Sequence, residues 1–235
     1  MSLNTRFSST LAAARSAFSK HVHSIAICAG IGLIAAPAMA QDVWIAPDRP
    51  FVEFDNGRDF IVIERDQNPD ARIPEFFTQT SRQCPPFCIQ PMDAGPGVTT
   101  VGELEVLDFM EEYVNIGEGA IIDARLPEWY RRGTIPGAIN LSFTAFENPE
   151  TNPFMAPILT MLGGTRSNPT DPWQFEDALD LVVFCNGQWC GQSHRAISNL
   201  LSVGYPGEKI RYYRGGMQGW VTVGLTVEVP VVATQ

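Results

Sequence analysis

Apolar residues from about position 100 onward follow two kinds of pattern. Continuous apolar runs predict buried strands at 119–125, 138–141, 178–184 and 210–214. Apolar residues at helical spacing predict helices at 99–114, 156–162, 193–205 and 217–224. Because strands alternate with helices, the pattern predicts an α/β fold built on a parallel sheet.

Residues 42–98 show a different pattern. Two β-like segments, 51–54 and 60–64, flank Asn56-Gly57 and predict a hairpin with a tight turn. Prolines then interrupt 67–98, which predicts irregular surface structure. We therefore expect an extension at 41–96, a compact domain at 97–228 and a short tail at 229–235.

Short polar residues and glycines mark the ends of the predicted helices. Thr100 and Glu103 have the spacing of a capping box in the helix of 99–114. Ser193 is expected to cap the start of the helix of 193–205, and Gly204 is expected to end it.

Residues 1–40 have the pattern of a secretory signal. They contain three basic residues and no acid, and their apolar stretch closes on Ala38-Met39-Ala40. The alternative is an uncleaved anchor helix, but the apolar stretch is short for a membrane span and is broken by Pro37. We therefore expect cleavage before Gln41 and a periplasmic protein that does not associate with the membrane after cleavage.

Removal of residues 1–40 makes the chain more acidic. The whole chain has 16 basic and 26 acidic residues and a net charge of −10, and the removed segment holds three of the basic ones, so the net charge becomes −13. Such a chain repels nucleic acid and anionic membranes, whereas its surface would suit a basic protein partner. His194 becomes the only histidine, which excludes a site with several histidine ligands.

The predicted mature chain keeps two close pairs of cysteines, Cys84 with Cys88 and Cys185 with Cys190. In an oxidising compartment this arrangement favours disulfides, and the spacings fit zinc or iron–sulfur sites poorly. We therefore expect no metal and no cofactor.

The local pairing of Cys84 with Cys88 depends on the backbone of Pro85-Pro86. Extended as polyproline, this segment would hold the two cysteines about 12 Å apart. A disulfide needs Cα atoms within about 7 Å, so a local bond requires a turn or a helix start here. The sequence leaves a Cys84–Cys88 disulfide open against free thiols, metal binding or pairing elsewhere.

The stretch LVVFCNGQWCGQSHR, residues 181–195, carries the candidate chemistry. Cys185 ends the most apolar predicted strand, and Ser193 begins the next helix. A loop curled over a helix start directs backbone N–H groups inward, where they bind an anion and lower the pKa of a thiol. The alternative is that Cys185 is an inert core thiol. The loop residues are Asn186, Gly187, Gln188, Trp189, Cys190 and Gly191.

Four segments of the chain resemble the rhodanese-like sulfurtransferase family: IIDAR (121–125), GTIPGAINL (133–141), LVVFCNGQWCGQS (181–193) and YYRGGMQGWVTVGLTV (212–227). The resemblance covers roughly 97–228. It implies a five-stranded parallel sheet with helices on both faces, here preceded by an N-terminal β and irregular extension. It also implies a cysteine that carries sulfur as a persulfide from a small sulfur-containing anion to a thiol acceptor.

The same resemblance assigns roles to individual residues. Cys185 takes the place of the catalytic cysteine, and the backbone of Asn186–Gly191 takes the place of the active-site loop. Asp123 and Arg125 match supporting residues that brace the fold. The structural positions near the loop are matched by Gly215, Gly216 and Trp220.

The chain departs from the family pattern in three places. Thr134 replaces a common histidine, and the active-site loop is about two residues longer than usual. Cys190 stands near the position of an arginine that often ends the loop, so we expect anions to bind through backbone amides and thiosulfate to bind weakly. The sequence leaves three roles open for Cys190: a resolving thiol, a disulfide partner of Cys185 or a loop residue with no chemical role.

Two other functions compete with sulfur transfer. A thiol–disulfide oxidoreductase would use Cys185 and Cys190, although its usual motif has two residues between the cysteines. A non-catalytic binding module of the same fold would use neither thiol. A cysteine phosphatase is disfavoured, because Gly191 stands where such enzymes place an arginine that holds the phosphate.

Overall fold

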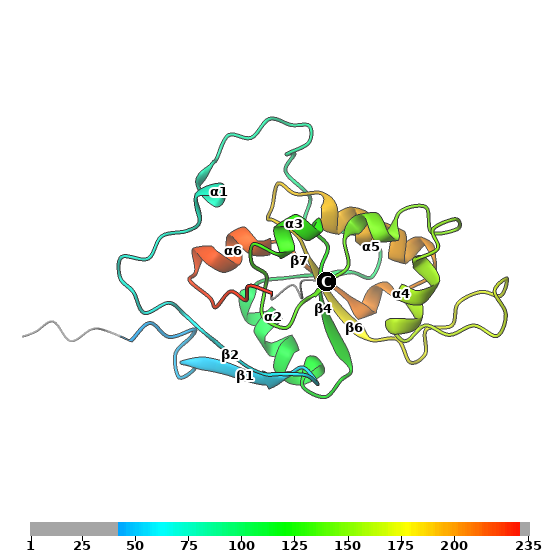
Figure 1. Cartoon of the computed structure of the whole chain (residues 1–235), viewed down its shortest axis with the longest axis horizontal. Coiled ribbons are helices and arrows are strands. Elements are labelled where there is room, and N and C mark those ends of the chain that lie inside the picture. The colour runs from blue at the N-terminus through cyan, green and yellow to red at the C-terminus, as the bar shows by residue number, and fades with distance from the viewer. Residues whose placement is uncertain (1–41, 231–235) are drawn as a thin grey trace, which may run out of the picture. The chain divides into compact units, whose positions relative to one another are not determined.

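A five-stranded parallel sheet forms the centre of residues 42–230, the part of the chain that the computed structural model describes (Figure 1). The strand order is β3-β7-β6-β4-β5, and every neighbouring pair is parallel. This arrangement confirms the predicted fold class. The strands are β3 (Thr99–Val101), β4 (Gly119–Asp123), β5 (Ile139–Asn140), β6 (Asp180–Phe184) and β7 (Ile210–Tyr213).

The predicted signal, residues 1–40, lies outside the described residues, and so does 231–235 of the predicted tail. Within 42–230, no helix is both long enough and apolar enough to cross a membrane.

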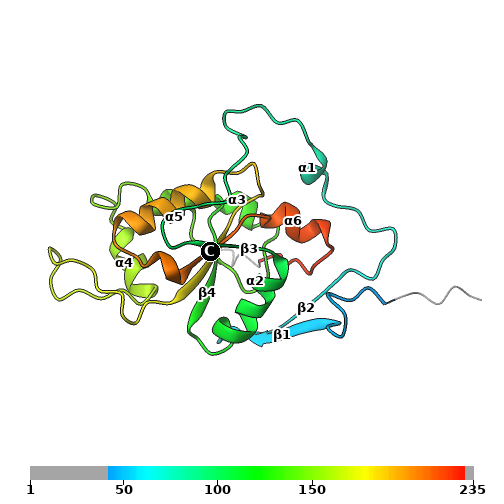
Figure 2. The ribbon, with the colours of Figure 1, turned by 180° about the vertical axis from the view of Figure 1, so that it is seen from behind.

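Helices cover both faces of the sheet, with α2 and α6 on one side and α4 and α5 on the other (Figures 1 and 2). These helices are α2 (Glu103–Phe109), α4 (Met155–Met161), α5 (Gln192–Ser202) and α6 (Gly216–Thr222). Shorter helical segments are α1 (Glu75–Thr78), η1 (Met110–Val114), α3 (Pro127–Tyr130), η2 (Phe143–Phe146) and η3 (Gly207–Lys209).

The central strand β6 explains why its sequence is a continuous apolar run. Leu181 and Val183 pack into the core on the side of α4 and α5, whereas Val182 and Phe184 pack on the side of α2 and α6. All four side chains are fully buried. A strand covered on both faces has no solvent-facing side, so the alternation typical of half-exposed strands is absent.

The predicted helix of 99–114 is wrong at its start. Thr99–Val101 form β3, which pairs with Arg211–Tyr213 of β7, and α2 begins only at Glu103. The predicted capping pair is also displaced, because the carboxylate of Glu105 accepts the backbone N–H of Gly102 at 2.9 Å. An edge strand of this length is too short for its pattern to be distinguished from the first turn of a helix.

The predicted hairpin is present as the antiparallel pair β1 (Phe51–Asp55) and β2 (Phe60–Glu64). Gly57 supplies a positive φ of 80°, and the side chain of Asn56 accepts the backbone N–H groups of Arg58 and Asp59.

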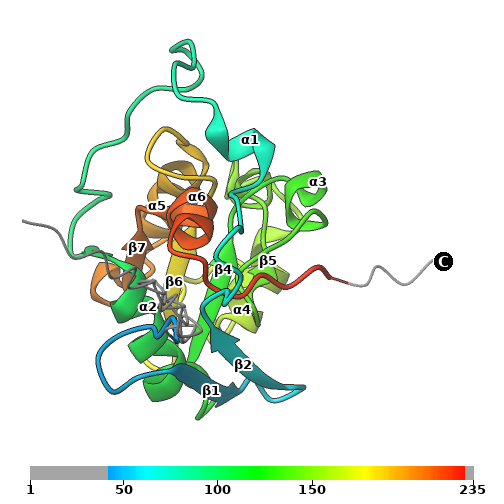
Figure 3. The same cartoon turned by 90° about the vertical axis from the view of Figure 1, so that its left-hand side faces the viewer.

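The hairpin packs on the domain through one face. Its inward residues Val52, Phe54 and Ile63 are buried in the same core cluster as α2 and α6. From the hairpin, the extension runs along the domain to α1 at the opposite end (Figure 3). Apart from α1, residues 67–98 form no helix or strand, as their prolines predict.

A buried ion pair braces the carboxyl end of β4. Asp123 and Arg125 are 0% and 2% exposed, and their closest atoms, Oδ2 and Nη2, lie 2.6 Å apart. Asp123 also accepts the hydroxyl of Thr134 at 2.8 Å, and Arg125 donates to the carbonyl of Gly133 at 2.6 Å. Thr134, the residue in place of the family's histidine, is therefore part of this network.

We expect Asp123→Ala to lower the free energy of unfolding by about 3–5 kcal/mol, because the variant leaves the Arg125 charge buried without its partner. The control is Asp108→Ala, which removes a half-exposed partner of Arg49 and should cost at most about 1 kcal/mol. Urea unfolding of the purified chain measures both. Similar losses in the two variants would contradict a structural role for the buried pair.

Candidate active site

Cys185 lies directly after β6, at the carboxyl edge of the sheet, as the sequence predicts. The helix that follows begins earlier than expected, because α5 starts at Gln192 and Gly191 occupies its N-cap. Ser193 is therefore not the cap. Its side chain is fully buried in the first turn, and its hydroxyl oxygen lies 3.1 Å from the sulfur of Cys185.

The end of β6 is held against the start of α6. The backbone N–H of Met217 donates to the carbonyl of Cys185 at 3.0 Å, and that of Gln218 donates to the carbonyl of Asn186 at 2.9 Å. Gly216 makes this approach possible. Its φ is 55°, and a Cβ atom at this position would lie 2.5 Å from the carbonyl oxygen of Cys185.

Two opposing effects act on the pKa of Cys185. Burial raises it, because the charged thiolate loses its contact with water. Hydrogen bonds from the thiol of Cys190, the hydroxyl and backbone N–H of Ser193 and the backbone N–H of Gly187 lower it. The hydrogen bonds outweigh burial and bring the pKa from its ordinary value of 9.0 to about 7. Cys185 is therefore suited to react as a nucleophile near neutral pH.

Cys190 has the opposite properties. Its hydrogen bond to Cys185, its burial and the charge of a Cys185 thiolate all raise its pKa, so it stays protonated and acts as a donor. When Cys185 is protonated instead, its thiol donates to the backbone carbonyl of Cys190 at 3.0 Å. Both cysteines are free and buried. The structure thus brings the two predicted loop thiols together without joining them.

The other loop residues are held by neighbouring segments. The indole N–H of Trp189 donates to the side chain of Gln218 at 2.7 Å, and the carbonyl of Gln188 accepts the backbone N–H of Gln90 at 2.8 Å. Asn186 connects the loop to the buried ion pair, because its Oδ1 lies 3.5 Å from Nη1 of Arg125. The buried pair of Asp123 and Arg125 therefore contacts the loop through Asn186 and helps to hold it in place.

The extension covers this loop, a role that the sequence pattern did not predict. The guanidinium of Arg82 lies over the rings of Phe76, Trp189 and Phe87, at 4.2, 4.4 and 5.2 Å from their centres. One of its terminal nitrogens also donates to the carbonyl of Phe76. Such cation–π contacts attach the extension to the loop. No periodicity marks these residues, and their position in a proline-rich segment indicated only surface structure.

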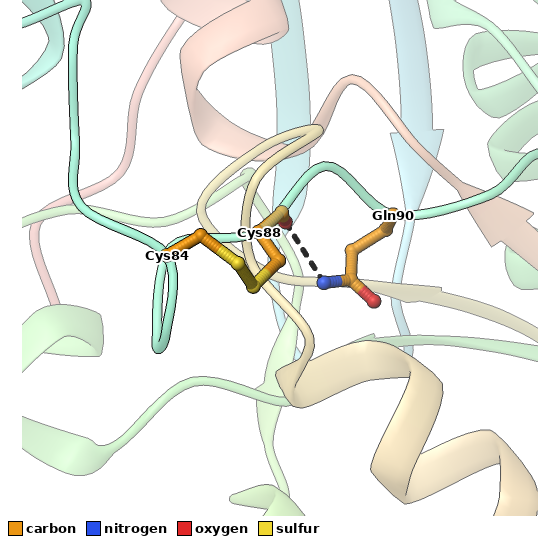
Figure 4. Close-up of a disulfide and its surroundings, with 3 residues drawn as sticks. All are labelled: Cys84, Cys88 and Gln90. Carbon is orange, nitrogen blue, oxygen red and sulfur yellow. Dashed lines mark hydrogen bonds between the residues drawn. A yellow bond between two sulfur atoms is a disulfide. The ribbon is translucent and has the colours of Figure 1, made fainter.

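Cys84 and Cys88 lie in the same part of the extension. The chain turns between them, which brings their Cα atoms to 4.6 Å, and the structure has them joined as a disulfide (Figure 4). Gln90 follows this turn, and its side-chain amide donates to the carbonyl of Cys88 at 2.9 Å (Figure 4). Gln90 also packs against Gly191, where a Cβ atom would lie 3.4 Å from Nε2 of Gln90. The turn is thus positioned directly against the active-site loop.

A cavity of about 210 Å³ opens between the extension, α3 and the loop. Cys190 lines it, whereas Cys185 lies beneath and is 2% exposed. Larger hollows of about 570–690 Å³ elsewhere on the surface touch neither thiol. The cavity beside the loop is lined by Phe76, Pro86, Phe87, Trp129, Asn186, Trp189, Cys190, Gly191 and Gln192.

Two side chains just after the loop, Arg195 and His194, do not take part in the cavity. Arg195 forms an ion pair with Glu147 on the surface. His194 packs its ring edge-on against Tyr212, with the centres 4.6 Å apart, and burial together with nearby Arg214 lowers its pKa. Neither residue lines the cavity. Among residues 42–230, no group of three or more His, Cys, Asp or Glu side chains could hold a metal ion.

Comparison with known proteins agrees with this geometry. The model of the rhodanese-like domain matches residues 106–222. No curated protein matches the chain.

Solved structures that resemble the chain include a human single-domain sulfurtransferase, with 26% identity over 52% of this chain and 95% of that one and a TM-score of 0.36. A Rhodopseudomonas palustris protein of unknown function, described as a possible tyrosine phosphatase, has 20% identity over 57% of this chain and 88% of that one, with a TM-score of 0.42. A Pseudomonas aeruginosa thiosulfate sulfurtransferase has 22% identity over 58% of this chain and 21% of that one, with a TM-score of 0.38.

The assignment rests on the matched family model together with the order of the parallel strands and the placement of Cys185 after the central one. This chain therefore belongs to the rhodanese-like family, with its rhodanese-like domain at residues 106–222.

Proposed function

We propose that the protein is a sulfurtransferase that carries sulfane sulfur as a persulfide on Cys185. The observation that carries the proposal is the lowered pKa of a strand-end thiol that accepts hydrogen bonds from Ser193, Cys190 and the loop backbone. Such a thiolate is a nucleophile toward the outer sulfur of a small anion such as thiosulfate.

The reaction has two balanced steps. The thiolate of Cys185 attacks the outer sulfur of thiosulfate, the sulfur–sulfur bond of thiosulfate breaks, and sulfite leaves with the electron pair. An acceptor thiolate then takes the outer sulfur of the persulfide, which releases the Cys185 thiolate. No external oxidant or reductant is consumed in either step.

We further propose that the protein acts in the periplasm after removal of residues 1–40. The signal-like sequence supports this location, and the net charge of −10 for the whole chain supports the absence of nucleic acid among its partners. The Cys84–Cys88 disulfide fits an oxidising compartment.

A second function, thiol–disulfide exchange between Cys185 and Cys190, is favoured by one observation. The two thiols contact each other in a single loop, and only one of them has a lowered pKa. Oxidation would join the two sulfurs with loss of two protons and two electrons to a disulfide donor. We propose that this bond, where it forms, blocks sulfur transfer until it is reduced.

The assignment of Cys185 is tested by loading reduced protein with thiosulfate and measuring the intact mass. Cys185→Ser should abolish the persulfide adduct, because the nucleophile is gone. Cys190→Ser is the matched control and should retain loading. Loading lost in Cys190→Ser but retained in Cys185→Ser would show that the roles are reversed. A wild-type protein that never loads would favour a non-catalytic binding module.

The pH dependence follows from the lowered pKa of Cys185. The thiolate fraction should rise with pH and reach one half at about pH 7, whereas an ordinary thiol reaches it near 9.0. Alkylation by iodoacetamide, followed for the Cys185 peptide by mass spectrometry, measures this midpoint. Ser193→Ala should move the midpoint to higher pH, since a hydrogen bond to the thiolate is lost. A wild-type midpoint near pH 9 would contradict the proposed activation.

The blocking role of the second thiol is tested by oxidation. Wild-type protein treated with a mild disulfide donor should lose loading and recover it after reduction. Cys190→Ser should load equally well before and after reduction, because it cannot form the blocking bond. If the oxidised wild type loads as fast as the reduced form, the Cys185–Cys190 pair does not regulate transfer.

A further inference from the structure

The cavity beside the loop is built from aromatic rings that the extension and α3 contribute. Phe76 and Phe87 come from the extension, Trp129 from α3 and Trp189 from the loop. We propose that this cavity is a subsite for an apolar organic group on the sulfur donor. The preferred donor is then an organic thiosulfonate with a single aryl group, rather than inorganic thiosulfate. This inference rests on the proposed sulfur transfer.

The size of the cavity selects one ring. An apolar cavity of about 150 Å³ holds a benzene molecule. The cavity here measures about 210 Å³, which leaves room for one six-membered ring and a few further atoms.

The charge of the lining points to the same donor class. No Lys, Arg, Asp or Glu lines the cavity. The nearest cation, Arg82, packs against the rings of Phe76, Phe87 and Trp189 but does not itself line the cavity. Thiosulfate carries two negative charges and would lose its hydration there without a direct ion pair. An organic thiosulfonate carries one negative charge, and its apolar group gains by leaving water for contact with the rings.

The rings are held in place before any ligand binds. Arg82 lies over Phe76, Phe87 and Trp189, and Phe76 contacts Trp129 with ring centres 4.1 Å apart. The indole of Trp189 is further fixed by its hydrogen bond to Gln218. A preformed site avoids the cost of ordering these side chains on binding.

The cavity also lies where a donor needs it. Cys190, Asn186 and Gly191 line it, and the backbone carbonyl of Cys190 lies 3.0 Å from the sulfur of Cys185. An aryl group in the cavity therefore holds the attached thiosulfonate at the active-site loop. Attack by the Cys185 thiolate transfers the outer sulfur, the sulfur–sulfur bond of the donor breaks, and an organic sulfinate leaves with the electron pair.

The kinetic test compares benzenethiosulfonate with thiosulfate as donors to the purified chain. We expect a kcat/KM for benzenethiosulfonate at least about tenfold above that for thiosulfate, the scale expected for burying a ring. Trp129→Ala and Phe87→Ala should each reduce this ratio about tenfold. Phe60→Ala, which removes an exposed ring of β2, is the matched control and should keep the ratio. A wild-type ratio near one, or an equal ratio in all variants, would overturn the subsite.

A binding test separates the subsite from the reaction. Benzenesulfinate, the expected leaving group, needs no sulfur transfer to bind, and methanesulfinate has the same charge without the ring. Calorimetry should show benzenesulfinate binding at least about tenfold more tightly than methanesulfinate. This preference should be lost in Trp129→Ala and Phe87→Ala and kept in Phe60→Ala. If benzenesulfinate binds selectively but Cys185 never loads sulfur, the subsite is retained and the sulfurtransferase function is rejected. If Cys185 loads sulfur but binding shows no preference for the ring, the sulfurtransferase function is retained and the subsite is rejected.

Discussion

A thiolate buried at the end of a strand is stable only if hydrogen-bond donors replace the water that it has lost. This requirement accounts for the construction around Cys185. Ser193 and the loop backbone provide donors, and Cys190 provides another because its own pKa is raised. Gly216 lets the backbone of α6 approach closely enough to fix the carbonyl of Cys185 on the opposite side. The active-site loop thus supplies the hydrogen-bond donors that a thiolate needs where water does not reach it.

The extension completes the site rather than merely covering the domain. Gln90 binds the loop backbone, Arg82 lies over the loop aromatic Trp189, and Phe87 brings a ring to the cavity. The Cys84–Cys88 disulfide closes the turn that presents Phe87 (Figure 4). The cavity above the loop is therefore lined mainly by aromatic rings, and Arg82 packs against three of them.

Much of the fold could be predicted because its signals are long or redundant. The apolar run of β6, the hairpin turn at Asn56-Gly57 and the segment that contains Gly215 and Gly216 each predicted what the structure contains. The edge strand β3 was missed because three residues carry no readable period. Ser193 was misassigned because a serine before an apolar helix fits both a cap and a first-turn position.

The candidate thiols were predictable from their place in the chain, but their surroundings were not. Phe76, Arg82 and Phe87 belong to a proline-rich segment, and their approach to the loop depends on tertiary contacts between residues about 100 apart, which no local pattern encodes. The difference in pKa between Cys185 and Cys190 likewise depends on which donors the folded loop directs at each sulfur.

We expect the transferred sulfur to reside on Cys185 during the reaction. The most direct measurement exposes reduced wild-type protein briefly to a donor whose outer sulfur is isotopically labelled, then fragments the peptide that contains both loop cysteines in a mass spectrometer. We expect the labelled sulfur on Cys185 and an unmodified Cys190. Label found on Cys190, or no label on either cysteine, would contradict the claim.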